Sequence, residues 1–179
     1  MISISTFDEL NKILRKQLIL QSELPSKRVA NSDTLYGVTL DKLLKDKIFI
    51  SLDSKDNILL FELISRNSSN DINFSETDSN INSYKSYELK IIIYGNTSPD
   101  IATNVEARFR TEYVLNDLQN QGIYIESVSE PIIIHEFINE SQWTRTDLSI
   151  YISCKFEIKP ITILDDYSDY SDIIVIKGE

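Results

Sequence analysis

One stretch near the end of the chain decides the fold: Asp147-Leu148-Ser149-Ile150-Tyr151-Ile152-Ser153-Cys154-Lys155-Phe156-Glu157-Ile158. Apolar and polar residues alternate strictly along it. This pattern predicts a strand with one face in the core and the other exposed or against a partner. The stretch before it, Ser141-Gln142-Trp143-Thr144-Arg145-Thr146, is polar and aromatic, and we interpret it as a hinge that leads into the strand.

The same alternating strand closes a module that begins at Tyr87. A strand is expected over 87–94, followed by a turn and a helix over 98–120. Ser98 as the N-cap, Pro99 at the first helical position and Gly122 after the last turn mark the ends of that helix. Two further strands are expected over 123–129 and 131–138.

The first half of the chain opens with a helix over residues 6–20, in which Thr6 and Glu9 form a capping box. Residues 21–33 are expected to form a connection, and strands are expected at 35–40, 47–52 and 58–64. Residues 65–86 are polar and too long for an ordinary connection. They form either a surface loop or an arm that binds a neighbouring subunit, with Phe74 and Ile81 as its anchors.

These elements predict an α+β fold, in which helices 6–20 and 98–120 pack on a mostly antiparallel, twisted sheet. Residues 1–160 are expected to form this single domain. Residues 161–179 are expected to form an acidic extension with the run Asp165–Asp172, ending in a strand of four aliphatic residues. That strand, Ile173-Ile174-Val175-Ile176, could pair within its own domain or with a neighbour's sheet.

Composition narrows the function classes. The 179 residues carry a formal net charge of −10, which argues against binding a nucleic acid backbone but is compatible with lining a channel for DNA. The single cysteine permits no disulfide within the chain. No secretory signal or apolar run of about 20 residues is present, so we expect the protein to be cytosolic when it is made.

Catalysis is not indicated. The chain has one histidine, His135, and one cysteine, Cys154, too few for a zinc site, and it carries no nucleotide-binding or hydrolase motif. The acidic run 165–172 lacks the features of a calcium loop. A hydrolase that pairs Cys154 with His135 on adjacent strands is the least favoured class. We therefore expect no enzyme, no cofactor and no metal.

Trp143 and Arg145 permit two interpretations. In the first, Trp143 fills the edge of the core and Arg145 forms a local ion pair. In the second, both residues belong to a subunit interface, where Trp and Arg are enriched. The sequence leaves both open.

The run 87–95 before a helix, and Gln142-Trp143-Thr144-Arg145-Thr146-Asp147-Leu148, resemble the corresponding parts of phage neck and tail terminator proteins. The opening helix and residues 29–36 fit the same pattern, although the prolines and glycine expected between Asn31 and Tyr36 are absent. The resemblance covers about residues 6–158, is strongest over 87–158, and leaves out the tail after Pro160.

The resemblance implies a structural protein of the virion. Such proteins form a ring, commonly of six subunits, on the end of the tail tube. The ring stops tube growth and presents a surface to the head-tail connector, and in contractile particles it also holds the last ring of sheath protein. DNA would pass only as cargo. The alternative is a small acidic adaptor of the host that captures a basic partner. The expected interface residues are Phe74, Ile81, Trp143, Arg145, Ile173, Ile174, Val175 and Ile176.

Overall fold

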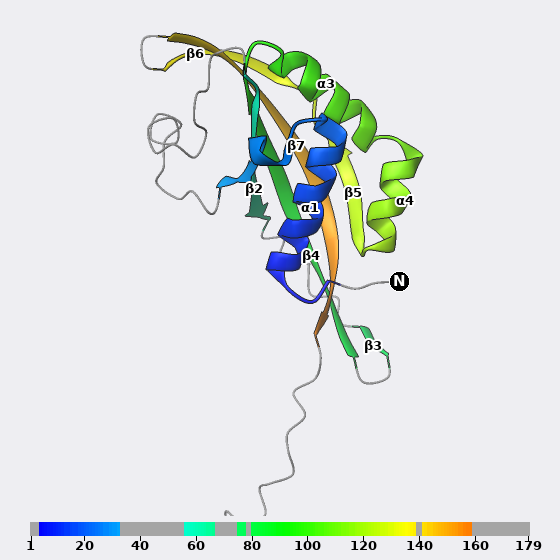
Figure 1. The fold of residues 1–179 in the computed structure, drawn as a ribbon. Helices are drawn as coiled ribbons and strands as arrows, with labels where there is room; N and C mark the ends of the chain where they lie inside the picture. Colours follow the sequence, from blue (N-terminus) through cyan, green and yellow to red (C-terminus); the bar gives the residue numbers. More distant parts are fainter. Residues whose placement is uncertain (1–3, 33–55, 67–74, 78–79, 139–140, 159–179) are drawn as a thin grey trace, which may run out of the picture.

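The computed structural model describes residues 4–32, 56–66, 75–77, 80–138 and 141–158. Within these ranges the chain forms one seven-stranded sheet with three α-helices on one of its faces (Figure 1). None of the described helices is long and apolar enough to cross a membrane. The elements in chain order are α1 (Phe7–Ser22), the short 3-10 turn η1 (Ser26–Arg28), β1 (Val29–Asn31), β2 (Ile58–Ser65), β3 (Ser75–Thr77), β4 (Asn80–Tyr94), α3 (Ser98–Phe109), α4 (Glu112–Asn120), β5 (Ile123–Val128), β6 (Ile132–Ile138) and β7 (Ser141–Ile158).

The sheet is built around the long pair β4 and β7. Its main order is β1-β2-β4-β7-β5, while β3 pairs with β4 and β6 pairs with β7. Only β1 and β2 pair in parallel among the described strands. On the side of β7 away from β4, β6 covers residues 141–147 and β5 covers residues 150–154. The predicted α+β class with a mostly antiparallel sheet is therefore confirmed.

The polar and aromatic segment before the alternating stretch is not a hinge. Residues 141–146 are the first part of β7, an 18-residue strand. They pair with β6 on one side, and Arg145 and Thr146 also pair with β4 on the other. Thr and Trp favour strands, and the hairpin from Ile138 to Ser141 fixes the register of this part of β7.

Most of the polar segment 65–86 that the structure describes is also strand. β2 continues to Ser65, β3 covers three residues, and β4 begins at Asn80. These Asn- and Ser-rich residues extend because β7 is long enough to pair with β4 as far as Ile81↔Ile158. Tertiary pairing thus overrides weak strand propensity. The expected arm is reduced to residues 67–74 and 78–79, which lie outside the described residues.

The expected helix 98–120 is two helices, α3 and α4. The break falls at Arg110 and Thr111, where Thr111 adopts an extended backbone and its hydroxyl donates to the Arg108 carbonyl at 2.6 Å. The N-cap of α3 is Thr97, not Ser98, which is the first helical residue and is buried. The left-handed glycine after the last turn is confirmed, since Gly122 has φ 78°.

The opening helix is confirmed as α1, with one change to its cap. The Glu9 amide donates to Thr6 Oγ1 at 3.1 Å, while the Glu9 carboxylate accepts from the amide of Ser5 at 2.9 Å. The expected connection 21–33 contains the short strand β1, which the sequence reasoning missed. The strand expected at 58–64 is β2, and those at 35–40 and 47–52 lie outside the described residues.

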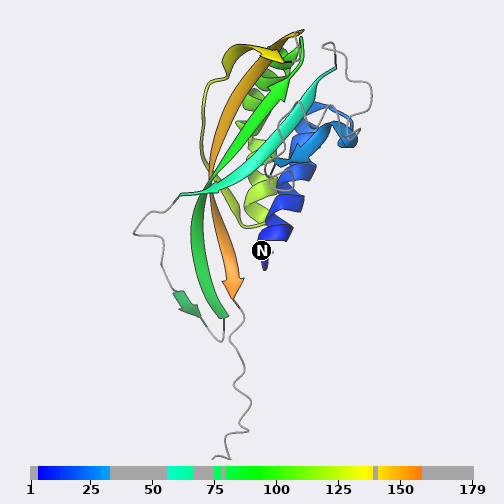
Figure 2. The same ribbon diagram turned by 90° about the vertical axis from the view of Figure 1, so that its left-hand side faces the viewer.

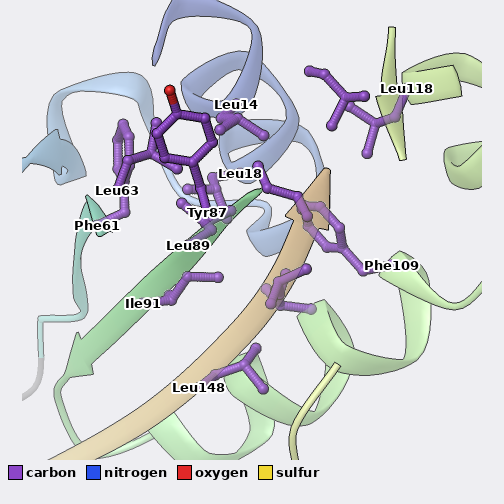
Figure 3. Packing of buried hydrophobic residues seen from close by; sticks show 14 of the residues in the cluster. Leu14, Leu18, Phe61, Leu63, Tyr87, Leu89, Ile91, Phe109, Leu118 and Leu148 are labelled. Atoms are coloured by element: carbon purple, nitrogen blue, oxygen red, sulfur yellow. The ribbon is translucent and has the colours of Figure 1, made fainter. Parts of the chain in front are cut away.

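The main core lies between the helices and one face of the sheet, as Figure 2 shows from the side. Alternate residues of β4 and β7 point into it, and Cys154 and Phe156 lie at its far end beside Ile4, which bridges to Phe156. Figure 3 shows the packing of α1, α3 and α4 onto the strands. Its labelled residues are Leu14, Leu18, Phe61, Leu63, Tyr87, Leu89, Ile91, Phe109, Leu118 and Leu148. The opposite face of the sheet carries no described helix, so its side chains do not belong to the core under the helices.

Candidate interaction surface

The helix-free face of the sheet is polar along most of β4 and β7. Ser149 Oγ donates to Glu88 Oε1 at 2.7 Å. Arg66 pairs with Glu126 at 3.1 Å, and its guanidinium lies 4.8 Å from the centre of the Tyr151 ring. These bonds join different strands on one surface. The face is therefore ordered by polar contacts and exposes charged and hydroxyl groups.

A denser polar cluster lies on the same face, where β4, β6 and β7 meet. Arg145 donates from Nε and Nη2 to the two carboxylate oxygens of Asp147, both at 2.6 Å. Its Nη1 donates to Glu136 Oε1 at 2.8 Å. The Tyr94 hydroxyl donates to the other Glu136 oxygen at 3.4 Å. The side chains of this cluster link β4, β6 and β7, in addition to the backbone pairing of these strands.

The surroundings of Arg145 and Tyr94 keep both side chains protonated at neutral pH. Hydrogen bonds to Asp147 raise the pKa of Arg145, which stays charged. Burial raises the pKa of Tyr94 to about 12, and the carboxylate of Glu136 adds to this while Arg145 opposes it. Tyr94 is therefore a neutral donor. One guanidinium faces two carboxylates in a half-buried site.

Trp143 lies beside this cluster and is only 4% exposed. Together with Ile58, Leu60 and Tyr94 it is buried but does not belong to the core under the helices. The strand alternation places all four side chains on the helix-free face. Burial of Trp143 and the ion pairs of Arg145 match the first of the two interpretations above. A role for either residue in a subunit interface stays a prediction.

The edge strand β6 exposes large apolar side chains. Ile132 is 62% exposed, Ile133 is 54% exposed and Phe137 is 79% exposed. Among the described residues β6 pairs with β7 alone, so its other edge has no strand beside it. Ile132 lies opposite Asp147 and Ile133 opposite Thr146, so these two side chains are on opposite faces of the sheet. The sequence reasoning missed this surface, although three consecutive isoleucines without alternation are its signal.

Of the predicted interface residues that the structure describes, Trp143 and Arg145 lie together, whereas Ile81 lies far from both. Ile81 lies at one end of the β4–β7 pair, opposite Ile158, whereas Arg145 lies at the other end, opposite Tyr94. Thirteen residues of β7 separate these two levels, about 43 Å of strand. Phe74 and residues 173–176 lie outside the described residues.

A Cys–His pair is excluded by the register. His135 lies opposite Thr144 and Cys154 opposite Ile123, with ten residues of β7, about 33 Å, between the two levels. Contact across adjacent strands, which the sequence left possible, is therefore wrong. Burial also raises the pKa of the Cys154 thiol to about 12. Among the described residues no three His, Cys, Asp or Glu side chains are placed to hold a metal ion.

Comparison with known families identifies the family of this chain. The model of the phage neck terminator protein family matches residues 49–179, from before β2 to Glu179. The chain belongs to this family. It is thus a phage neck protein and a component of the virion, and the family is one of structural proteins.

The match also corrects the extent of the resemblance. It leaves out α1 and residues 29–36, and it includes the tail after Pro160. Because the match runs to Glu179, the acidic run and residues 173–176 belong to the family pattern. No curated protein matches this chain.

Proposed function

We propose that this neck protein closes as a ring on the head-proximal end of the tail tube, stops tube growth and joins the tail to the head-tail connector. The observation that carries the proposal is the family match, which runs through the sheet and the tail. Tube protein, connector and, in a contractile particle, sheath protein are the partners. The proposed ring is a hexamer of this chain.

The two ends of the sheet suit a ring. A ring needs two different, complementary surfaces on each subunit, because a heterologous contact closes only when unlike patches meet. The β1 end of the sheet is a short parallel strand, whereas the β6 end is an apolar antiparallel strand. Neither end repeats the other, which favours a head-to-tail contact over a symmetric dimer.

The charge of the chain suits a channel for DNA. A formal net charge of −10 per subunit repels the phosphate backbone and so prevents DNA from adhering to the ring. Passage without binding is the behaviour required of a channel through which a genome leaves the head. DNA is cargo in this proposal and not a ligand.

Light scattering over a concentration series, with and without tail tubes, tests the proposal. Six 20.6 kDa subunits give a ring of about 124 kDa. We expect that mass, or a monomer that assembles only on tube ends, together with a narrow distribution of tube lengths when the protein is present during polymerisation. A monomer that leaves tube growth unchanged at every concentration would contradict the proposal and return interest to an adaptor role.

A matched pair of variants sharpens the test. Phe137 on β6 and Tyr113 on α4 are both aromatic and highly exposed, 79% and 81%. Phe137→Asp should weaken assembly if the β6 end is a subunit contact, because a buried unpaired charge is costly there. Tyr113→Asp is the control for the added charge. Equal assembly of the two variants would remove β6 from the interface.

A further inference from the structure

We propose that β6 accepts the segment Ile173–Ile176 of a neighbouring copy as an added antiparallel strand. This inference rests on the proposed ring and names the contact that closes it. The acceptor is a described strand, and the donor is a segment of the chain outside the described residues.

The exposed edge of β6, the acceptor strand, favours pairing with another strand. An edge strand with unpaired backbone groups and exposed apolar side chains invites uncontrolled association unless another strand occupies it. β6 combines both features, since it pairs with β7 alone among the described strands and exposes Ile132, Ile133 and Phe137. A virion protein has to stay in solution before it assembles. Pairing of such an edge with one specific strand prevents uncontrolled association.

The donor matches the acceptor in chemistry. The exposed apolar residues of β6 lie on both faces of the sheet, because Ile132 and Ile133 point to opposite sides. A strand with alternating polar residues would match only one face. Ile173-Ile174-Val175-Ile176 is apolar on both faces and consists of β-branched residues, which favour strands. The family match runs through these residues.

Chain length favours a neighbour over the same copy. An antiparallel strand that covers Phe137 has to start beside this residue, which lies opposite Gln142 on β7, 16 residues before Ile158. That is about 53 Å of strand. The 15 steps from Ile158 to Ile173 span at most about 54 Å, with no residue left to reverse the direction of the chain. The same copy could cover Phe137 with its tail only in parallel, which is the less stable pairing.

Thiol crosslinking between two differently tagged variants tests the inference. One variant carries Ile133→Cys or Phe137→Cys, and the other carries Ile174→Cys or Val175→Cys. The native Cys154 is buried and stays in both. The variants are mixed, assembled and oxidised gently, and a disulfide forms only where Cα atoms come within about 7 Å. We expect a crosslinked pair that carries both tags.

The controls separate the other occupants. Tyr113→Cys, exposed on α4, is mixed with the same donors and should give no pair. A chain with both Phe137→Cys and Val175→Cys reports pairing within one copy. An internal crosslink in place of the two-tag product, or equal yield with the Tyr113 control, would overturn the inference. Light scattering on the same samples distinguishes the two proposals. A ring without the two-tag crosslink removes the β6 contact and leaves the function standing, whereas a chain that never assembles removes both.

Discussion

Arg145 and Asp147 lie two residues apart on one face of β7, and the guanidinium holds both oxygens of the carboxylate at 2.6 Å. Strand alternation brings this pair to the same side, and the third donor of Arg145 reaches Glu136 on β6. The bidentate geometry is what distinguishes Arg from Lys at such a site. Arg145 therefore links β6 and β7 through its side chain.

Replacing Arg145 should destabilise the fold. Arg145→Gln leaves the half-buried carboxylates of Glu136 and Asp147 facing each other without a cation, and we expect the free energy of unfolding to fall by about 2 kcal/mol. Arg145→Lys keeps the charge but not the fork and should lose about half as much. Urea unfolding measures both. Equal stability of the wild type and Arg145→Gln would show that the cluster contributes nothing.

Tyr94 should make stability depend on alkaline pH. Its pKa rises from 10.0 to about 12 on folding, so the folded state retains a proton that the unfolded state loses. The stabilising contribution is complete below about pH 10 and is lost as the pH rises through about 12. Tyr94→Phe should reduce the loss of stability across this window. The comparison needs the same background, since Cys154 shifts in the same direction from 9.0. Parallel profiles of wild type and variant would contradict the assignment.

Gly95 should tolerate no side chain. Its φ is +127°, and a Cβ there would lie 2.3 Å from Asn57 Oδ1 and 2.8 Å from the Asp56 carbonyl oxygen. We expect Gly95→Ala to cost about 3 kcal/mol, because backbone strain and a clash with main chain add together. Gly122→Ala, at φ 78°, is the matched variant and should cost about 1 kcal/mol. Thermal unfolding of the two variants checks the difference, and equal costs would show that the loop at Asp56 and Asn57 yields easily.

Cys154 should resist modification in the native state. The thiol is buried in β7 and its pKa is raised to about 12 by burial. In a Tyr113→Cys variant, a thiol reagent should label one site at once and the other about a thousandfold more slowly, at the rate of local or global opening. The exposed cysteine serves as the internal control. Two equally fast phases would reopen a reactive role for Cys154.

Local sequence patterns predict several elements of the fold well. The alternation over 147–158, the N-cap at Thr6 and the glycine at 122 each depend on neighbours in sequence, and the structure confirms them. The lengths of β4 and β7 could not be predicted in this way. Residues 80–86 and 141–146 have weak or mixed strand signals, and they are strands because of their pairing partners: 81–86 pair with the distant strand β7, and 141–146 pair with the adjacent strand β6.

The candidate interaction surface, too, is predicted in part from local patterns and in part depends on strand pairing. Trp143 and Arg145 stand out by residue type, and strand alternation brings Asp147 to the same face as Arg145. Glu136 and Tyr94 join Arg145 only through the register of three strands. The break between α3 and α4 coincides with hydrogen bonds from the hydroxyl and the amide of Thr111 to the Arg108 carbonyl. The run of isoleucines marks β6 as apolar on both faces, but its place at the edge of the sheet is a property of topology.

The central position of β7 has a consequence for synthesis. It is the last described strand in the chain, yet it pairs with β4, β5 and β6 and closes the core through Phe156 on Ile4. A nascent chain on the ribosome cannot complete this high-contact-order sheet until residue 158 has left the exit tunnel. A product truncated before that point lacks the strand that joins the two halves of the sheet. Incomplete chains therefore fail to fold, and they cannot be incorporated as subunits of the neck.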